Sequence, residues 1–134
     1  MLALAVVACS TPGIEGFETI DIVVGGESLT VAVADTPPLR SQGLQSLDEL
    51  PEGLDGMLFV FELPQTASFH MRTVGLDLDI WWFDEEGSLL GSTEMVTCLD
   101  IECVTYPSPG RVKWALETRH ASYTFTSGQL LGFP

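Results

Sequence analysis

The sequence is poor in basic side chains. Its 134 residues include five Lys and Arg residues against nineteen Asp and Glu residues, which gives a formal net charge of -14 at pH 7. Proteins bind nucleic acid phosphates and anionic lipid headgroups through clusters of Lys and Arg. The scarcity of both residue types therefore argues against nucleic acid as a partner. A salty habitat, in which acidic surfaces stay solvated, is one explanation of the charge.

The sequence also lacks the common catalytic signatures. It contains no G-x-S-x-G nucleophile elbow, no phosphate-cradling glycine loop and no H-E-x-x-H motif. Its length suits one domain, because 134 residues can bury a single core and are too few for two. We therefore expect one domain with no cofactor and no bound metal, and we leave open whether it is an enzyme.

The chain begins with an uncharged stretch, MLALAVVAC at residues 1–9, after which the composition becomes polar and rich in Gly and Pro. The stretch is far too short to span a membrane. It is consistent with a first strand, with part of a core helix or with the end of a secretory signal. We favour the signal, because residues 6–9, Val-Val-Ala-Cys, resemble the lipobox of bacterial lipoproteins, whose cysteine is lipidated and becomes the mature amino terminus.

The signal interpretation divides the chain into three parts. Residues 1–9 are the remnant of a lipoprotein signal that ends at Cys9, residues 10–17 are a tether, and residues 18–134 are a single domain. Acyl chains on Cys9 would hold the protein at a membrane, because each buried methylene contributes about 0.8 kcal/mol and more than one chain gives stable anchoring. We therefore expect an extracytoplasmic bacterial protein, either lipid-anchored to the cell envelope or secreted.

Two cysteines, Cys98 and Cys103, remain once Cys9 is assigned to lipidation. An even number of cysteines in an oxidising compartment predicts a disulfide. A loop this short gives roughly 2 kcal/mol in the loop-closure description, so the bond would shape one loop rather than hold the fold together. The alternatives are a metal site completed by His70 and His120, whose spacing does not match known zinc knuckles, and a redox pair, which normally has two intervening residues.

Alternating apolar residues and turn signals predict a β-rich fold. We expect strands at residues 20–24, 28–34, 56–61, 68–73, 76–83, 88–96 and 112–117. A short helix is expected over residues 36–44, because Thr36 is a suitable cap and Pro37 suits the first helical position. About seven short strands and one short helix predict a mainly β domain (α+β minor), a small antiparallel β-barrel or sandwich.

Short motifs follow one another in a specific order between residues 34 and 118. They are Ala-Asp-Thr-Pro at 34–37, Arg40 with Gly43-Leu44, Asp-Gly-Met-Leu-Phe-Val-Phe at 55–61, Phe-His-Met-Arg at 69–72, Leu-Asp-Ile at 78–80, Phe83-Asp84, Cys98, Cys103, Tyr106, Ser108 and the strand at 112–117. In this order and spacing they resemble the DUF192 (UPF0127) family. The resemblance implies a small prokaryotic protein, often secreted or lipid-anchored, with no assigned activity.

The chain departs from the family pattern at one motif. The family usually reads Phe-Trp-Met-Lys-Asn-Thr where this chain has Phe-His-Met-Arg-Thr-Val at residues 69–74, and Asp77 stands where a proline is common. The positive charge is kept as Arg72, but the amide and hydroxyl that follow it are altered. If those groups bind a ligand in relatives, the resemblance implies that this member binds a different ligand or none.

Arg40 and Arg72 are the first candidate site residues, since apolar residues flank both and an unpaired buried charge costs several kcal/mol. One interpretation is an internal ion pair, for instance of Arg72 with Asp79 or Asp55. The other is a cleft that grips an anionic or polar ligand. Four residues would form the apolar lining of such a cleft: Met57, Phe61, Met71 and Tyr106.

Other candidates are acidic residues and histidines. Asp77 and Asp79 would lie on one strand face about 7 Å apart, suited to a cation or to acid–base chemistry, or simply solvated. Asp79 is the better candidate because it matches a family motif. His70 is either a structural histidine or a ligand or base, and His120 is expected at the surface.

These observations support a preferred hypothesis and an alternative. The preferred one is a non-enzymatic module of the cell envelope that binds a partner protein or a small ligand around Arg40, Arg72 and the cysteine loop. The alternative is a hydrolase-type enzyme that uses a cleft around Arg72 and Asp79, with His70 as a further candidate. A metal protein built on Cys98 and Cys103 is a third hypothesis.

Overall fold

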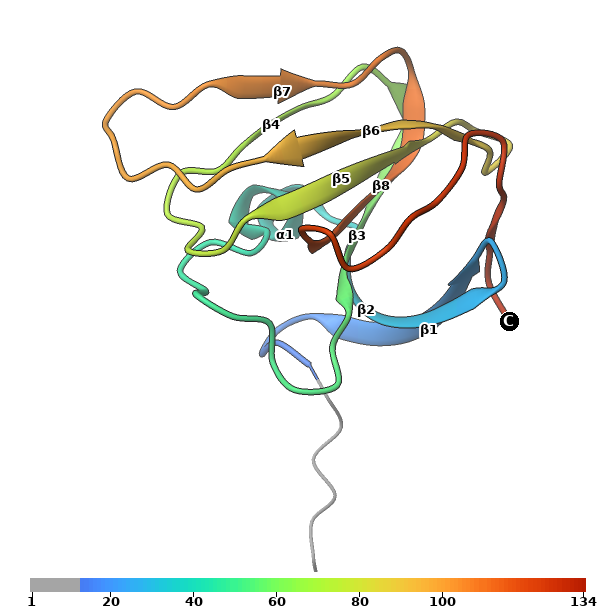
Figure 1. Ribbon diagram of the computed structural model, residues 1–134, viewed down its shortest axis with the longest axis horizontal. Helices are drawn as coiled ribbons and strands as arrows, with labels where there is room; N and C mark the ends of the chain where they lie inside the picture. Colours follow the sequence, from blue (N-terminus) through green and yellow to red (C-terminus); the bar gives the residue numbers. More distant parts are fainter. Residues whose placement is uncertain (1–12) are drawn as a thin grey trace, which may run out of the picture.

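The computed structural model describes residues 13–134, in which nine strands and one short helix form a mainly β domain (Figure 1). This confirms the fold class expected from the sequence. In chain order the elements are β1 (Glu18–Val24), β2 (Glu27–Ala34), α1 (Pro37–Gln42), β3 (Gly56–Gln65), β4 (Ser68–His70), β5 (Leu78–Phe83), β6 (Leu89–Met95), β7 (Thr105–Pro107), β8 (Val112–Arg119) and β9 (Leu131–Gly132). The expected signal remnant with Cys9, and the first part of the expected tether, lie outside the described residues. Among the described residues, no helix has the length and apolar character needed to cross a membrane.

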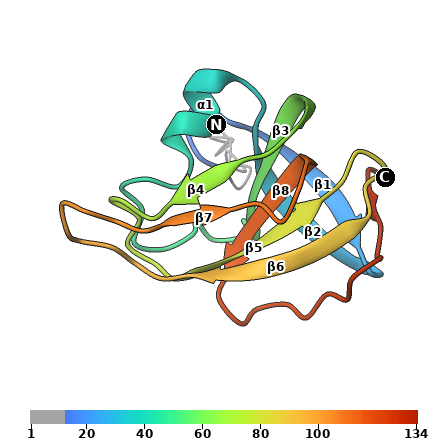
Figure 2. The same ribbon diagram turned by 90° about the horizontal axis from the view of Figure 1, so that it is seen from above.

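Seven strands form one mixed sheet in the order β6-β5-β8-β3-β2-β1-β9, and the sheet curls into a half-barrel (Figures 1 and 2). The expected hairpin of β1 and β2 is confirmed, and its turn residues Gly25 and Gly26 have positive φ angles of 56° and 82°. Two consecutive residues of this kind match the twist of the flanking strands and favour glycine. The expected hairpin of β5 and β6 is also confirmed.

One strand pair differs from the antiparallel arrangement that we expected. β2 and β3 are parallel. The connection between them contains α1, and a crossover of this kind joins parallel strands. The helix itself forms where the sequence predicted it: the Thr36 hydroxyl accepts a hydrogen bond from the Leu39 amide, and proline stands at the start of the first turn.

β4 and β7 form a separate two-stranded sheet. The sequence predicted one strand over residues 68–73 and a loop after residue 61, but β3 continues to Gln65 and β4 ends at His70. The register of β3 against β8 shifts between Val60 and Gln65. Such an irregularity bends a strand, so the chain leaves the main sheet here and Phe69 pairs with Tyr106 in the small sheet.

The main sheet has a core on each face, because alternate residues of its central strands point in opposite directions. The first core includes Met57 of β3, Ile80 of β5 and Ala115 of β8, and α1, the loop that follows it and the small sheet pack over it. Ile14 and Phe17, at the end of the expected tether, also pack here.

The second core lies on the opposite face and contains Leu58, Trp81 and Leu116. The segment after β8 covers it, with Tyr123 and Phe125 packed against the core and stacked on each other with their ring centroids 5.4 Å apart. Strands β3, β5 and β8 are therefore buried on both faces.

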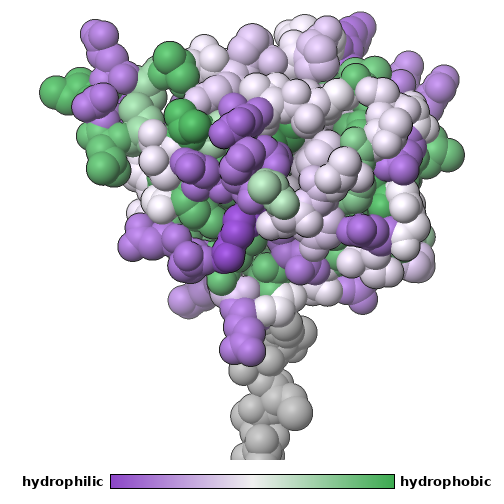
Figure 3. Space-filling view, in the orientation of Figure 1, coloured by the Kyte–Doolittle hydropathy of each residue, from purple (hydrophilic) through white to green (hydrophobic). Residues whose placement is uncertain are grey.

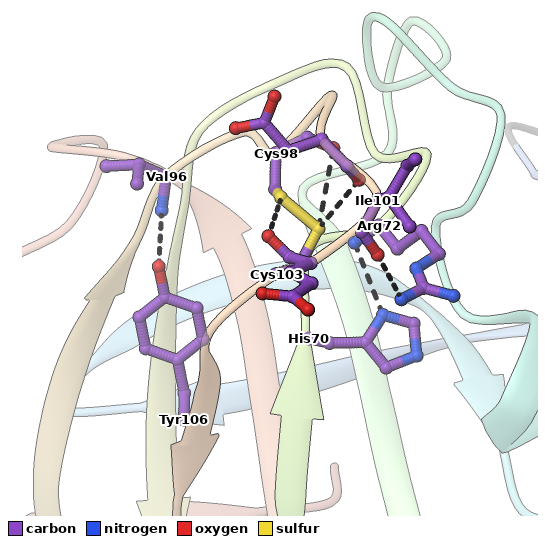
Figure 4. Close-up of a disulfide and its surroundings, with 9 residues drawn as sticks. His70, Arg72, Val96, Cys98, Ile101, Cys103 and Tyr106 are labelled. Carbon is purple, nitrogen blue, oxygen red and sulfur yellow. Dashed lines mark hydrogen bonds between the residues drawn. A yellow bond between two sulfur atoms is a disulfide. The ribbon is translucent and has the colours of Figure 1, made fainter.

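The loop between β6 and β7 extends from the domain at the upper left of Figure 1. It carries the expected disulfide between Cys98 and Cys103 (Figure 4). The bond closes a loop of only six residues, so it fixes the shape of this loop. The sheets themselves are stabilised by the two hydrophobic cores. Leu99 and Ile101 inside this loop are 92% and 90% exposed.

Candidate functional site

A groove of about 440 Å³ lies on the first-core side of the main sheet. One wall comes from α1 and the turn after it, through Arg40, Ser41 and Gln45. The opposite wall comes from the end of β3, the connection to β4 and β4 itself, and it includes Phe61 and Phe69. The small sheet thus completes a cavity that no single element could form.

Glu117 of β8 reaches this groove from the first core. In the register of the main sheet, Glu117 lies opposite Met57 of β3 on one side and Ile80 of β5 on the other, and both of these residues are completely buried. The side chain is only 4% exposed, yet it makes no hydrogen bond or ion pair with any residue in the described part of the chain. Every fully enclosed side-chain nitrogen or oxygen among residues 13–134 has a hydrogen-bond partner, so the Glu117 carboxyl must keep some access to the groove.

Burial determines the protonation of this carboxyl. Removal from water disfavours the charged form and raises the pKa of Glu117 from 4.5 to about 8. The side chain is therefore mainly protonated at neutral pH. In that state it can donate one hydrogen bond and can still accept, and on losing the proton it becomes a buried negative charge.

Aromatic rings line the groove that Glu117 reaches. Phe59 and Phe69 meet edge to face with their centroids 4.9 Å apart, and Phe69 makes a similar contact with Trp82 at 5.5 Å. Arg40 lies over the ring of Phe61 at 5.5 Å and donates a hydrogen bond of 2.9 Å to the Val60 carbonyl. Its guanidinium is thus held at the β3 wall.

The sequence-predicted site residues fall into separate groups. Arg40, Phe61 and His70 line the groove. Met57 and Met71 are buried in the first core. Tyr106 packs against that core, and its hydroxyl accepts a hydrogen bond from the Val96 amide (Figure 4).

Arg72 does not form the ion pair that we expected. Its guanidinium donates to the Ile101 carbonyl at 2.8 Å, and its backbone amide donates to Nδ1 of His70 (Figure 4). Of the proposed acidic partners, Asp55 accepts from the Thr30 amide and Asp79 pairs with a histidine. The expected pairing of Arg72 with Asp79 or Asp55 is therefore wrong, because an exposed arginine needs no acidic partner and a loop carbonyl is within reach.

Asp79 belongs to a different cluster. Its Oδ1 lies 2.8 Å from Nδ1 of His120, and its Oδ2 accepts a hydrogen bond from the Ala121 amide. The hydrogen bond to Asp79 raises the pKa of His120. Asp77 precedes β5, outside the strand that holds Asp79, and accepts a hydrogen bond from the Thr97 amide. Among the described residues no contact joins Asp79 to Arg72.

Cys98 and Cys103 do not form a metal site. Cys98 and Cys103 are bonded to each other, which makes the metal interpretation wrong. In residues 13–134, no three His, Cys, Asp or Glu side chains are grouped in a way that would hold a metal ion.

Sequence reasoning missed the most unusual residue of the groove. Glu117 alternates with the apolar positions 112, 114 and 116, a pattern that places it on a solvated face. The structure buries both faces of β8, between β3 and β5. The only sequence signal for burial of this region was the continuous apolar run of β3, which predicted a strand buried on both faces. The sequence does not show that β8 pairs with β3, so this signal could not be extended to Glu117.

The model of the DUF192 family, described as Uncharacterized ACR, matches residues 20–126. The chain belongs to the DUF192 family. A search of curated proteins finds no match to this DUF192 chain.

Two solved structures share the fold of this DUF192 domain. A protein from Sinorhizobium meliloti 1021, described as a "putative transcription regulator", has a TM-score of 0.77 at 20% identity, over 90% of this chain and 98% of that one. A protein of unknown function from Novosphingobium aromaticivorans DSM 12444 has a TM-score of 0.76 at 18% identity, over 93% of this chain and 94% of that one. At these identities the likeness concerns the fold alone.

Proposed function

We propose that this DUF192 domain is a binding module that holds a small ligand in the groove between α1, β3 and β4. The observation that carries the proposal is Glu117, a carboxyl in the first core with groove access and no partner among the described residues. Leaving a buried polar group unsatisfied costs free energy, so such groups are rare and call for an explanation. A ligand that completes its hydrogen bonds supplies one.

The rest of the groove supports the same function. Small-molecule sites are concave, mostly apolar and carry a few convergent polar groups. Here Phe59, Phe61 and Phe69 supply apolar surface, and Ser41 and Gln45 supply hydrogen-bonding groups at the α1 wall. Binding needs only these features, whereas the hydrolase alternative relied on a cleft around Arg72 and Asp79.

The test is amide NMR on the isotope-labelled protein with three probes that share one phenylethyl body: phenethylamine, phenethyl alcohol and hydrocinnamate. We expect at least one of them to cause saturable shifts at Gln65, Ser68 and Phe69. The variant Ser41→Trp fills the groove from α1 and should abolish them, whereas Ser92→Trp on β6 is the control and should not. If none of the three probes shifts these amides, or if the shifts are still seen in Ser41→Trp, the groove is not a ligand site.

We further propose that the module works at the cell envelope, anchored to the membrane through lipid on Cys9 or secreted. The lipobox-like residues 6–9 support this location, and so does the disulfide, since such bonds persist outside the reducing cytosol. Expression in a bacterial host should give protein that partitions into detergent, and Cys9→Ser should move it to the aqueous phase. Equal partitioning of both forms would rule out the lipid anchor.

The disulfide loop supports a second candidate function, docking of a partner protein. Four apolar side chains are exposed on and beside it: Val96, Leu99, Ile101 and Val104. Figure 3 shows this apolar surface at the upper left, next to hydrophilic residues. Since Asp100 and Glu102 lie in the same loop, the partner would present an apolar cleft bordered by basic residues.

Photo-crosslinking in intact cells tests this docking site. A crosslinker at position 99 should give one discrete adduct, which a crosslinker at position 63 on β3, also an exposed leucine, should not. Labelling that is the same from both positions would mean that the loop has no dedicated partner.

A further inference from the structure

Glu117 forms no ion pair with any residue in the described part of the chain, although cationic groups line the same groove. The other charged or titratable side chains that line the groove are Arg40 from α1 and His70 from β4. Arg40 is held against the Val60 carbonyl and the ring of Phe61, and Nδ1 of His70 accepts the Arg72 amide. Burial is the cause of the raised pKa of Glu117, and among residues 13–134 neither group forms a hydrogen bond or ion pair with its carboxyl.

The groove around this carboxyl favours a positive ligand over a negative one. An ionised Glu117 at its base would repel an anion, and desolvation would increase the repulsion. Aromatic rings attract cations through their negative faces, and Phe59 and Phe69 line the groove. The net charge of -14 also raises the local concentration of cations around the protein.

From these observations we infer that the ligand is an organic amine, whose ammonium group pairs with the Glu117 carboxylate while its apolar body lies among the phenylalanine rings of the groove. The inference rests on the proposed ligand groove and specifies the chemical class of the ligand. Pairing removes the cost of the lone buried charge, because a buried carboxylate is tolerated when a cation and hydrogen bonds satisfy it.

Protonation and binding are coupled in this site. The amine binds the ionised form, whereas the empty groove holds Glu117 mainly protonated at neutral pH. Binding near pH 7 therefore releases a proton from Glu117. The affinity should rise about tenfold per pH unit well below pH 8 and level off above it, as expected when a group must ionise for binding. Glu117→Gln separates the effect of this carboxyl from any effect of the other residues that line the groove.

The experiment is calorimetry with phenethylamine and phenethyl alcohol between pH 6 and pH 9, in two buffers that differ in ionisation enthalpy. We expect phenethylamine to bind at least ten times more tightly than the alcohol at pH 8, with close to one proton released per ligand at pH 7. The affinity of the alcohol should not rise with pH.

Glu117→Gln is the decisive variant, because it keeps the shape of the side chain and removes the charge. It should lose the pH dependence and the proton release, and it should bind the two probes equally. A thermal melt confirms that the variant is folded.

The outcomes separate this inference from the proposed function. Equal binding of amine and alcohol to the unchanged protein, or amine binding that does not depend on pH, would overturn the amine assignment and leave the groove as a ligand site. If neither these probes nor hydrocinnamate shift the groove amides, the proposed function fails together with the inference.

Discussion

Glu117 puts an acidic side chain into the first core, and the free energy of folding should depend on its protonation. The unfolded chain loses this proton near pH 4.5, whereas the folded protein keeps it to about pH 8. The folded state therefore binds more protons between these values, and the contribution of Glu117 to stability falls as the pH rises through this range. Most carboxyl groups act in the opposite direction, since they are stabilised as anions.

We predict that Glu117→Gln removes this pH dependence. The unfolding free energy of the unchanged protein minus that of the variant should fall by a few kcal/mol between pH 5 and pH 8, since each unit of pKa shift corresponds to about 1.4 kcal/mol. Urea unfolding at several pH values measures the difference, in which the other titrating groups cancel. A difference that stays constant with pH would mean that the carboxyl is well solvated in the folded protein.

The pair of Asp79 and His120 gives a second prediction at this scale. Because the hydrogen bond to Asp79 is the main cause of the raised pKa of His120, Asp79→Asn should lower that pKa. Glu94 lies farther from the imidazole, at 3.5 Å, so Glu94→Gln should lower it less. Titration of the His120 ring signals by NMR measures both shifts, and a larger effect from Glu94 would contradict this assignment.

At the scale of elements, the contact between β3 and β8 depends on a glycine. Gly56 faces the β8 backbone so closely that an added Cβ would lie 2.0 Å from the Glu117 carbonyl oxygen. Neither strand can move away easily, because β3 lies between β2 and β8, and β8 lies between β3 and β5.

We therefore expect Gly56→Ala to destabilise the domain by about 3 kcal/mol or more, or to prevent folding. Gly91→Ala on β6 is the matched control, since a Cβ there meets nothing within 4 Å, and it should change stability by less than about 1 kcal/mol. Denaturant unfolding compares the two variants. Similar stabilities for both would show that β3 and β8 can separate to accept a side chain.

The disulfide loop is the other element with a clear expectation. Replacement of Cys98 and Cys103 by serine should cost about 2 kcal/mol of stability, as for a short closed loop, and should leave ligand binding in the groove unchanged because the groove lining includes no residue of this loop. Urea unfolding and the NMR titration measure the two properties. Loss of groove binding in the double variant would mean that the loop also positions β4.

At the scale of the whole molecule, charge repulsion opposes folding. With nineteen acidic against five basic side chains, the compact state concentrates negative charge that salt can screen. We predict that raising NaCl from about 0.1 M to about 1 M increases the melting temperature by several degrees. A KCl series of equal ionic strength is the control for ion-specific effects, and a melting temperature that falls with salt in both would contradict net repulsion.

The sequence alone determined the local structure of this protein and its family. Three features depend only on residues close together in the chain and could therefore be predicted from the sequence. They are the hairpin turn at Gly25-Gly26, the helix start at Thr36-Pro37 and the disulfide that closes a six-residue loop. The ordered motifs between residues 34 and 118 carried the DUF192 resemblance, which the match over residues 20–126 confirms.

Only the tertiary structure decided the parallel pairing of β2 with β3, the partner of Arg72 and the position of Glu117. Each depends on segments far apart in the chain, such as β3 and β5, which enclose β8 from both sides. In β8, Glu117 alternates with apolar residues, so the sequence predicts that its side chain faces solvent. The two-residue period of a strand shows which residues share a face, but it does not show what covers that face. α1 and the small sheet cover the first-core face that carries Glu117, so an acid that looks solvated in the sequence lines a groove instead.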